Sequence, residues 1–285
     1  RQYGWETYYY GNAFAPGGRE RGWYTFDHRP RFNNNYLGLR QRVAILSEAY
    51  AYATFEERVR SSLYFVEEIL DFVDENAGEI RRIVSEADAR SVVGDSLALR
   101  ADFARSDERV DILMGAAIEE IHPLTGETLL LRADTQYVEP MFEYGTFRAT
   151  LRERVPAGYL VPPDQREVLV RLRAHGIETR PAPGEVMDIE GFRIDSVTTA
   201  ERPFQGRVEQ TWFGRWEAGR ITPLDGTVWV PADGALGRLA FALLEPRSDD
   251  GFAAWGLVSG EDAVVPRGMG GLYPIFRAHA APDFD

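Results

Sequence analysis

The stretch Val43-Ala44-Ile45-Leu46-Ser47-Glu48 indicates the fold of the first part of this sequence. A short run of apolar residues with a polar end is typical of a strand that is buried on both faces of a parallel or mixed sheet. Glu48 would then lie at the carboxyl end of that strand. Because ligands of open α/β sheets bind outside the carboxyl ends of the strands, Glu48 is a candidate catalytic group.

A long helix is predicted directly after this strand. Thr54 and Glu57 have the spacing of a capping box, in which the two residues satisfy each other's free backbone N–H groups. The acids of the segment are interpreted as its solvated face rather than as a metal site. Apolar residues follow the cap at steps of four and three and therefore share one helical face; they are Val59, Leu63, Val66, Leu70 and Val73.

Residues 1–36 precede the strand and are crowded with Tyr, Trp, Gly, Asn and Arg. Pro and Gly interrupt any regular period, so this stretch is predicted to be a loop. Aromatic and arginine side chains in ordered loops are common in binding sites. A surface loop that packs on its own aromatic residues is an equally good interpretation of the composition.

The segment Gly22-Trp23-Tyr24-Thr25-Phe26-Asp27-His28-Arg29-Pro30-Arg31-Phe32-Asn33-Asn34-Asn35-Tyr36, continued through Leu46-Ser47-Glu48-Ala49-Tyr50, resembles bacterial members of the carboxypeptidase A-like superfamily of zinc metallopeptidases. The resemblance implies that residues 1–75 are the C-terminal part of a catalytic domain. In that family a glutamate at this strand end is the general base on a zinc-bound water, and Glu48 is the matching position. A carboxylate suits this role because zinc lowers the pKa of the water toward neutrality.

The resemblance also implies residues that bind the substrate. The family uses a tyrosine from the loop before this strand and arginines that hold the C-terminal carboxylate of the peptide. Arg29 is the arginine we assign to substrate, with Arg31 and Arg40 as alternatives, although the usual arginine positions lie earlier in the domain. The candidate tyrosines are Tyr36, which we favour, Tyr24 and Tyr10.

The zinc ligands of the family are a histidine and a glutamate in a short motif and a second histidine well downstream, all before the segment seen here. None of the four histidines of this chain belongs to such a motif, so we interpret each as a structural hydrogen-bonding group. We therefore expect Zn²⁺ in the intact enzyme, ligands that are not in this chain, and a chain that begins mid-protein and is inactive alone. The histidines are His28, His122, His175 and His279.

The rest of the chain is predicted to be rich in short strands. Strands are expected at 128–132, after the turn Thr125-Gly126, and at 187–197 and 226–231. Helices are expected at 164–175 and 234–244, ended by Gly176 and Pro246. The predicted fold class is α/β, the end of a carboxypeptidase-type mixed-sheet domain over 1–75, then a helical connector over 76–106 and a β-rich α+β accessory domain over 107–285.

Pieces of this accessory domain, such as 157–162, 172–177 and 243–251, resemble the C-terminal parts of the same relatives. Asp249-Asp250 is either a calcium or substrate contact or, as we favour, a turn that exposes its acids. Four tryptophans form either a stacking surface for ligands or, as we favour, part of the core. They are Trp212, Trp216, Trp229 and Trp255.

Composition excludes several functions. The formal net charge of -13 repels phosphate backbones, so nucleic acid is not an expected partner. The absence of cysteine removes disulfides and thiolate chemistry. No apolar run is long enough to span a membrane. The family resemblance implies a peptide substrate and a secreted or periplasmic location.

Two functions follow from the sequence. The leading hypothesis is a zinc metallocarboxypeptidase that removes C-terminal residues from peptides, with Glu48 as general base. The alternative is a non-catalytic module that binds peptides or glycans, suggested by the tryptophan-rich β region, or a homologue that has lost its activity. The sequence leaves the side-chain specificity and the oligomeric state open.

Overall fold

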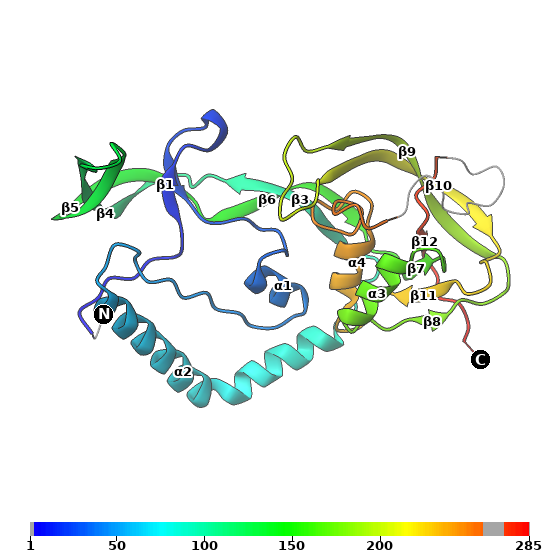
Figure 1. Ribbon diagram of the computed structural model, residues 1–285. Helices are drawn as coiled ribbons and strands as arrows, with labels where there is room; N and C mark the ends of the chain where they lie inside the picture. Colours follow the sequence, from blue (N-terminus) through cyan, green and yellow to red (C-terminus); the bar gives the residue numbers. More distant parts are fainter. Residues whose placement is uncertain (1–2, 259–270, 285) are drawn as a thin grey trace. The chain divides into compact units, whose positions relative to one another are not determined.

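The computed structural model describes residues 3–258 and 271–284, and its chain trace divides into two compact units (Figure 1). Unit 1 comprises Arg1–Asp27, Ile45–Ala77 and Asp102–Arg148. Unit 2 comprises His28–Ala44, Gly78–Ala101 and Ala149–Asp285. Both units are assembled from separate stretches of chain, so the predicted boundaries at 75 and 106 do not coincide with this division.

The predicted helix forms as α2 (Phe55–Ala89), with the predicted capping box at its start. The backbone N–H of Thr54 donates to Glu57 Oε2 at 2.7 Å, and the N–H of Glu57 donates to Thr54 Oγ1 at 3.3 Å. The helix continues through 76–89 as one element, where Arg82 pairs with acids one turn away on either side. The predicted helical connector over 76–106 is therefore wrong in its second half, since β3 (Ser96–Ala104) follows.

Unit 1 is built on a mixed four-stranded sheet in the order β1-β2-β5-β4. The strand pair β2/β5 is parallel, whereas β1/β2 and β4/β5 are antiparallel. The predicted strand at 128–132 is confirmed as the start of β5, and Gly126 takes φ +73° in the turn before it, which favours glycine. The strands are β1 (Asn12–Phe14), β2 (Gly22–Tyr24), β4 (Arg109–Ile121) and β5 (Thr128–Tyr144).

The buried strand predicted at 43–47 is not present. Residues 42–50 form no helix or strand, and the side chains of Val43, Ile45 and Leu46 are 65%, 55% and 47% exposed. A strand needs neighbours that pair its backbone groups and cover its apolar faces. An apolar run indicates that a segment favours burial, but it does not supply the strands that would bury it.

Unit 2 contains a six-stranded sheet in the order β10-β9-β12-β7-β11-β8, in which every neighbouring pair is antiparallel. The predicted strands at 187–197 and 226–231 correspond to β9 and β11. A further ladder joins β3 to β6 (Thr146–Arg154). The sheet strands are β7 (Gly158–Val161), β8 (Arg180–Pro181), β9 (Met187–Thr199), β10 (Gln210–Ile221), β11 (Val228–Pro231) and β12 (Phe276–Ala278).

Two helices pack on this sheet, as Figure 1 shows for α3 (Arg166–Ala174) and α4 (Gly237–Leu244). Their apolar side chains share one core with those of β7 and β11. Both predicted helices are confirmed together with their ends: Gly176 takes φ +74° after α3, and Pro246 follows α4.

The core interpretation of the tryptophans is confirmed for Trp212 and Trp229, which are 5% and 2% exposed. A short helix α1 (Asn33–Leu39) and a 3₁₀ turn η1 (Pro16–Gly18) are the remaining elements of the described residues. No helix in the described residues is long and apolar enough to cross a membrane.

Candidate functional site

Glu48, the proposed general base, lies in unit 1 within the irregular segment that follows α1. Its side chain is exposed. No other described residue forms a hydrogen bond or ion pair with its carboxylate. The structure therefore leaves this carboxylate open to solvent, and its catalytic role stays a prediction.

Tyr24 lies on β2 of unit 1 and is buried, with 1% of its surface exposed. Its ring stacks on Tyr144 with centroids 4.0 Å apart, and its hydroxyl donates to the backbone oxygen of Glu20 at 3.0 Å. Burial, followed by the hydrogen bond with Tyr144, raises the pKa of Tyr24 to about 12. These contacts give Tyr24 a place in the core of unit 1, and a contact with substrate stays a prediction.

Tyr36, the favoured tyrosine, lies on α1 in unit 2. Its hydroxyl lies 2.8 Å from Nδ1 of His175 and accepts a hydrogen bond from Arg40 Nη1 at 3.2 Å. Arg40 also donates to the backbone oxygen of His175 at 2.6 Å. Burial, helped by the charges of Arg40 and Arg171, lowers the pKa of His175. The three side chains connect α1 to the end of α3.

Arg29 and Arg31 meet acids from distant parts of unit 2. Arg29 Nη1 pairs with Glu209 at 3.3 Å, and Arg31 also pairs with Glu209. Arg31 donates to Asp250 from its backbone N–H at 2.6 Å and from Nε at 2.8 Å. The guanidinium of Arg31 lies 4.7 Å from the ring centroid of Trp255 and 6% of its side chain is exposed. Arg31 is thus a structural ion-pair partner in this unit.

The interpretation of Asp249-Asp250 as a turn with exposed acids is wrong for Asp250, which is 4% exposed. His28 Nε2 lies 2.9 Å from Asp249, one residue from the Arg31 partner. Hydrogen bonds and ion pairs therefore join the loop His28–Arg31 to the segment after α4. Closely spaced cations in one segment and adjacent acids in another are the signal that sequence reasoning could have used, because buried charges need partners.

The predicted site residues divide between the two units. Glu48 and Tyr24 belong to unit 1, and Tyr36 and Arg29 belong to unit 2. In the described range, no three or more His, Cys, Asp or Glu side chains are grouped so that they could hold a metal ion. The described residues therefore do not fit a zinc site.

Each histidine instead has a hydrogen-bonding role, as predicted. His28 bonds Asp249, and His175 bonds Tyr36. His279 Nε2 lies 2.8 Å from Glu190, and His122 Nδ1 accepts from the backbone N–H of Thr125 at 3.1 Å in the hairpin turn.

The chain is similar to curated fungal proteins. It is 27% identical over 257 residues to a protein of Trichophyton tonsurans named carboxypeptidase 2, with 87% of this chain and 43% of the relative covered. A protein of the same name from Trichophyton rubrum is 26% identical over 255 residues, with the same coverage. The chain thus spans less than half the length of these relatives. No protein-family profile and no solved structure matches it.

Proposed function

We propose that this chain is part of a zinc-dependent metallocarboxypeptidase that hydrolyses C-terminal residues from peptides. The supporting observation is the similarity to proteins named carboxypeptidase 2, which extends over 87% of the chain. The segment that contains Glu48 agrees with it, because its residues resemble those of metallocarboxypeptidases. A secreted or periplasmic location belongs to the same proposal.

Glu48 is the residue of this chain to which we assign chemistry. An exposed carboxylate can take a proton from an attacking water and return it to the leaving amine. Since the described residues hold no group of metal ligands, the proposal assigns them no metal-bound step. A zinc ion would be held by residues other than these.

The proposal is tested on the full product of the gene that encodes this chain. An N-blocked dipeptide with a free C-terminal carboxylate is the substrate, its C-terminal amide is the control, and released amino acid is measured with and without a zinc chelator. We expect release from the free acid alone and its loss with the chelator. Failure to cleave any peptide with a free carboxylate would exclude a carboxypeptidase.

The role of Glu48 is tested by Glu48→Gln. Because general acid–base catalysis contributes about 10²–10⁴-fold, we expect turnover to fall by about that factor. Glu67→Gln is the matched control, since Glu67 is an exposed glutamate on α2 outside that segment, and it should keep full activity. Wild-type turnover in Glu48→Gln would remove Glu48 from the mechanism.

A further inference from the structure

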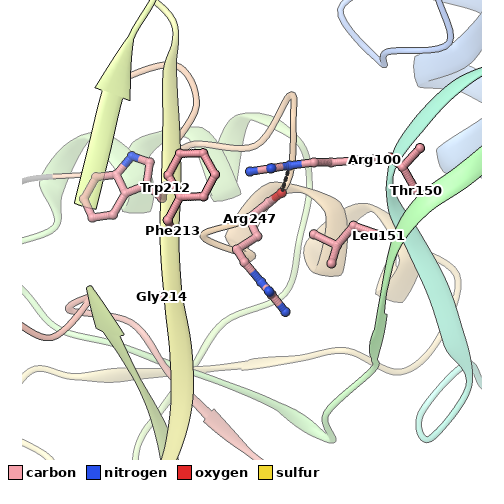
Figure 2. A pocket seen from close by; sticks show the side chains of 7 residues that line it. All are labelled: Arg100, Thr150, Leu151, Trp212, Phe213, Gly214 and Arg247. Atoms are coloured by element: carbon pink, nitrogen blue, oxygen red, sulfur yellow. Dashed lines mark hydrogen bonds between the residues drawn. The ribbon is translucent and has the colours of Figure 1, made fainter. Parts of the chain in front are cut away.

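Unit 2 contains a cavity of about 500 Å³ that the proposed peptidase chemistry does not use. Figure 2 shows Trp212 and Phe213 of β10 on one side, Leu151 of β6 on the other, and Arg100 and Arg247 between them. All of these residues belong to unit 2. Pockets for small molecules have volumes of about 300–1,000 Å³ and combine apolar walls with a few polar groups. This cavity has both properties.

Arg100 brings a positive charge to the cavity that no carboxylate of the described residues contacts. Its Nε donates to the backbone oxygen of Arg247 at 2.9 Å, which fixes the side chain, and its guanidinium lies 5.9 Å from the ring centroid of Phe213. Asp249 attracts it only from a distance and is bonded to His28. Burial lowers the pKa of Arg100. Its terminal N–H groups are thus available to a ligand.

Arg247 brings a second guanidinium to the cavity, and only some of its hydrogen-bond donors have partners. It pairs with Glu153 through one terminal nitrogen, but its Nε is buried and has no hydrogen-bond partner in the described structure. Burial lowers the pKa of Arg247, and the charges of Arg277 and Arg100 lower it further. Arg247 lines the cavity together with Arg100, so two guanidinium groups place positive charge beside it.

Arg277 is not among the residues that line the cavity, and its charge is paired within the protein. Its Nε donates to Glu245 at 2.7 Å, and its guanidinium stacks 3.7 Å from the ring centroid of Trp216. Tyr159 also donates to Glu245 at 2.7 Å. This network accounts for the charge of Arg277, so Arg100 and Arg247 are the cations that face the cavity.

We propose that this cavity binds a small organic monoanion, namely a carboxylate attached to an aromatic or similar apolar group. Guanidinium groups bind carboxylates through paired N–H donors, and Trp212, Phe213 and Leu151 supply apolar walls. Of the two cations, Arg247 already contacts one carboxylate, Glu153. One further negative charge therefore balances the pair, which favours a carboxylate over a phosphate monoester.

The inference is tested by calorimetric titration of the full chain with benzoate, and with three analogues that each change one property. Benzamide lacks the charge, acetate lacks the ring, and phenyl phosphate carries a larger charge. We expect benzoate to bind and each analogue to bind more weakly. Equal binding of benzamide, tighter binding of phenyl phosphate, or no heat from benzoate at millimolar concentration would each overturn the proposal.

Arg100→Gln keeps a side-chain donor but removes the charge, and we expect it to weaken benzoate binding by about tenfold or more. Arg215→Gln is the matched control, because Arg215 lies on β10 outside the cavity with 60% of its side chain exposed. Phe213→Ala, at a residue 43% exposed, is a second variant that should fold and should also weaken binding. Unchanged affinity in both Arg100→Gln and Phe213→Ala would refute the site.

Discussion

Removal of the Asp250 carboxylate should destabilise unit 2 more than the loss of any exposed ion pair. Asp250 is almost fully buried and accepts three hydrogen bonds: from the backbone N–H of Arg31 at 2.6 Å, from Arg31 Nε at 2.8 Å and from Trp255 Nε1 at 2.8 Å. Burial raises the pKa of Asp250, and the contacts with Arg31 oppose that shift. In Asp250→Ala, the buried guanidinium and the indole N–H both lose this acceptor.

The magnitude follows from the partners that remain. Removing one partner of a buried ion pair costs about 3–5 kcal/mol. Arg31 keeps its contact with Glu209, so we expect about 3 kcal/mol, the lower end. Since domains are stable by about 5–15 kcal/mol, this is a large fraction of the total. With a urea slope of about 1–3 kcal/mol per molar, the unfolding midpoint should fall by about 1–3 M.

Urea unfolding followed by tryptophan fluorescence measures this effect. Of the six tryptophans, all but Trp5 and Trp23 lie in unit 2, so the signal follows that unit. The matched control is Asp188→Ala, which removes an ion pair with Arg220 whose side chains are 79% and 75% exposed, and which should leave the midpoint unchanged.

The double variant Arg31→Met/Asp250→Leu separates the loss of a partner from the loss of the pair. Replacing both members removes the uncompensated charge, so we expect it to be more stable than Asp250→Ala. If Asp250→Ala unfolded at the wild-type midpoint, the reasoning from burial and hydrogen bonding would be refuted.

Two further predictions concern the core of unit 2. The pKa of His175 is lowered in the folded chain, so the unfolded chain binds its proton more readily, and the contribution of His175 to stability is lost as the pH falls below about 6.5. The free energy of unfolding should therefore change less between pH 7.5 and pH 5.5 in His175→Gln than in wild type. An equal change in both proteins would contradict the lowered pKa. Gly158→Ala should destabilise by about 1–3 kcal/mol, because an added Cβ would lie 2.3 Å from Trp229 Cζ2 and 2.6 Å from the backbone oxygen of Val230, whereas Gly184→Ala, with open space around it, should unfold at the wild-type midpoint.

Local signals predicted the local structure well. The Thr54/Glu57 capping box marks the start of α2, Gly176 and Pro246 mark the ends of α3 and α4, and Gly126 marks the hairpin turn before β5. Each depends on a property that a residue keeps in any fold: a side-chain acceptor for backbone N–H groups, a missing backbone N–H, or access to positive φ.

Signals that depend on distant partners failed. The apolar run at 43–47 predicted a buried strand, but no strand in the described structure pairs with it. The apolar stripe of α2 is likewise exposed, with Leu63 and Leu70 at 51% and 62%. Periodicity shows which face of an element is apolar, and a second element decides whether that face is covered.

The candidate functional residues show the same difference between local signals and contacts with distant partners. The resemblance that singled out Glu48 and Tyr36 came from a continuous stretch of sequence and agrees with the carboxypeptidase names of the fungal relatives. The sequence by itself thus determined the start of α2, the ends of α3 and α4, the turn before β5 and the family hypothesis, because each depends on residues that are close along the chain. Only the tertiary structure decided that Arg31 pairs with Asp250 and that Arg100 and Arg247 share a cavity, because charges 219 and 147 residues apart meet only after the strands between them have paired.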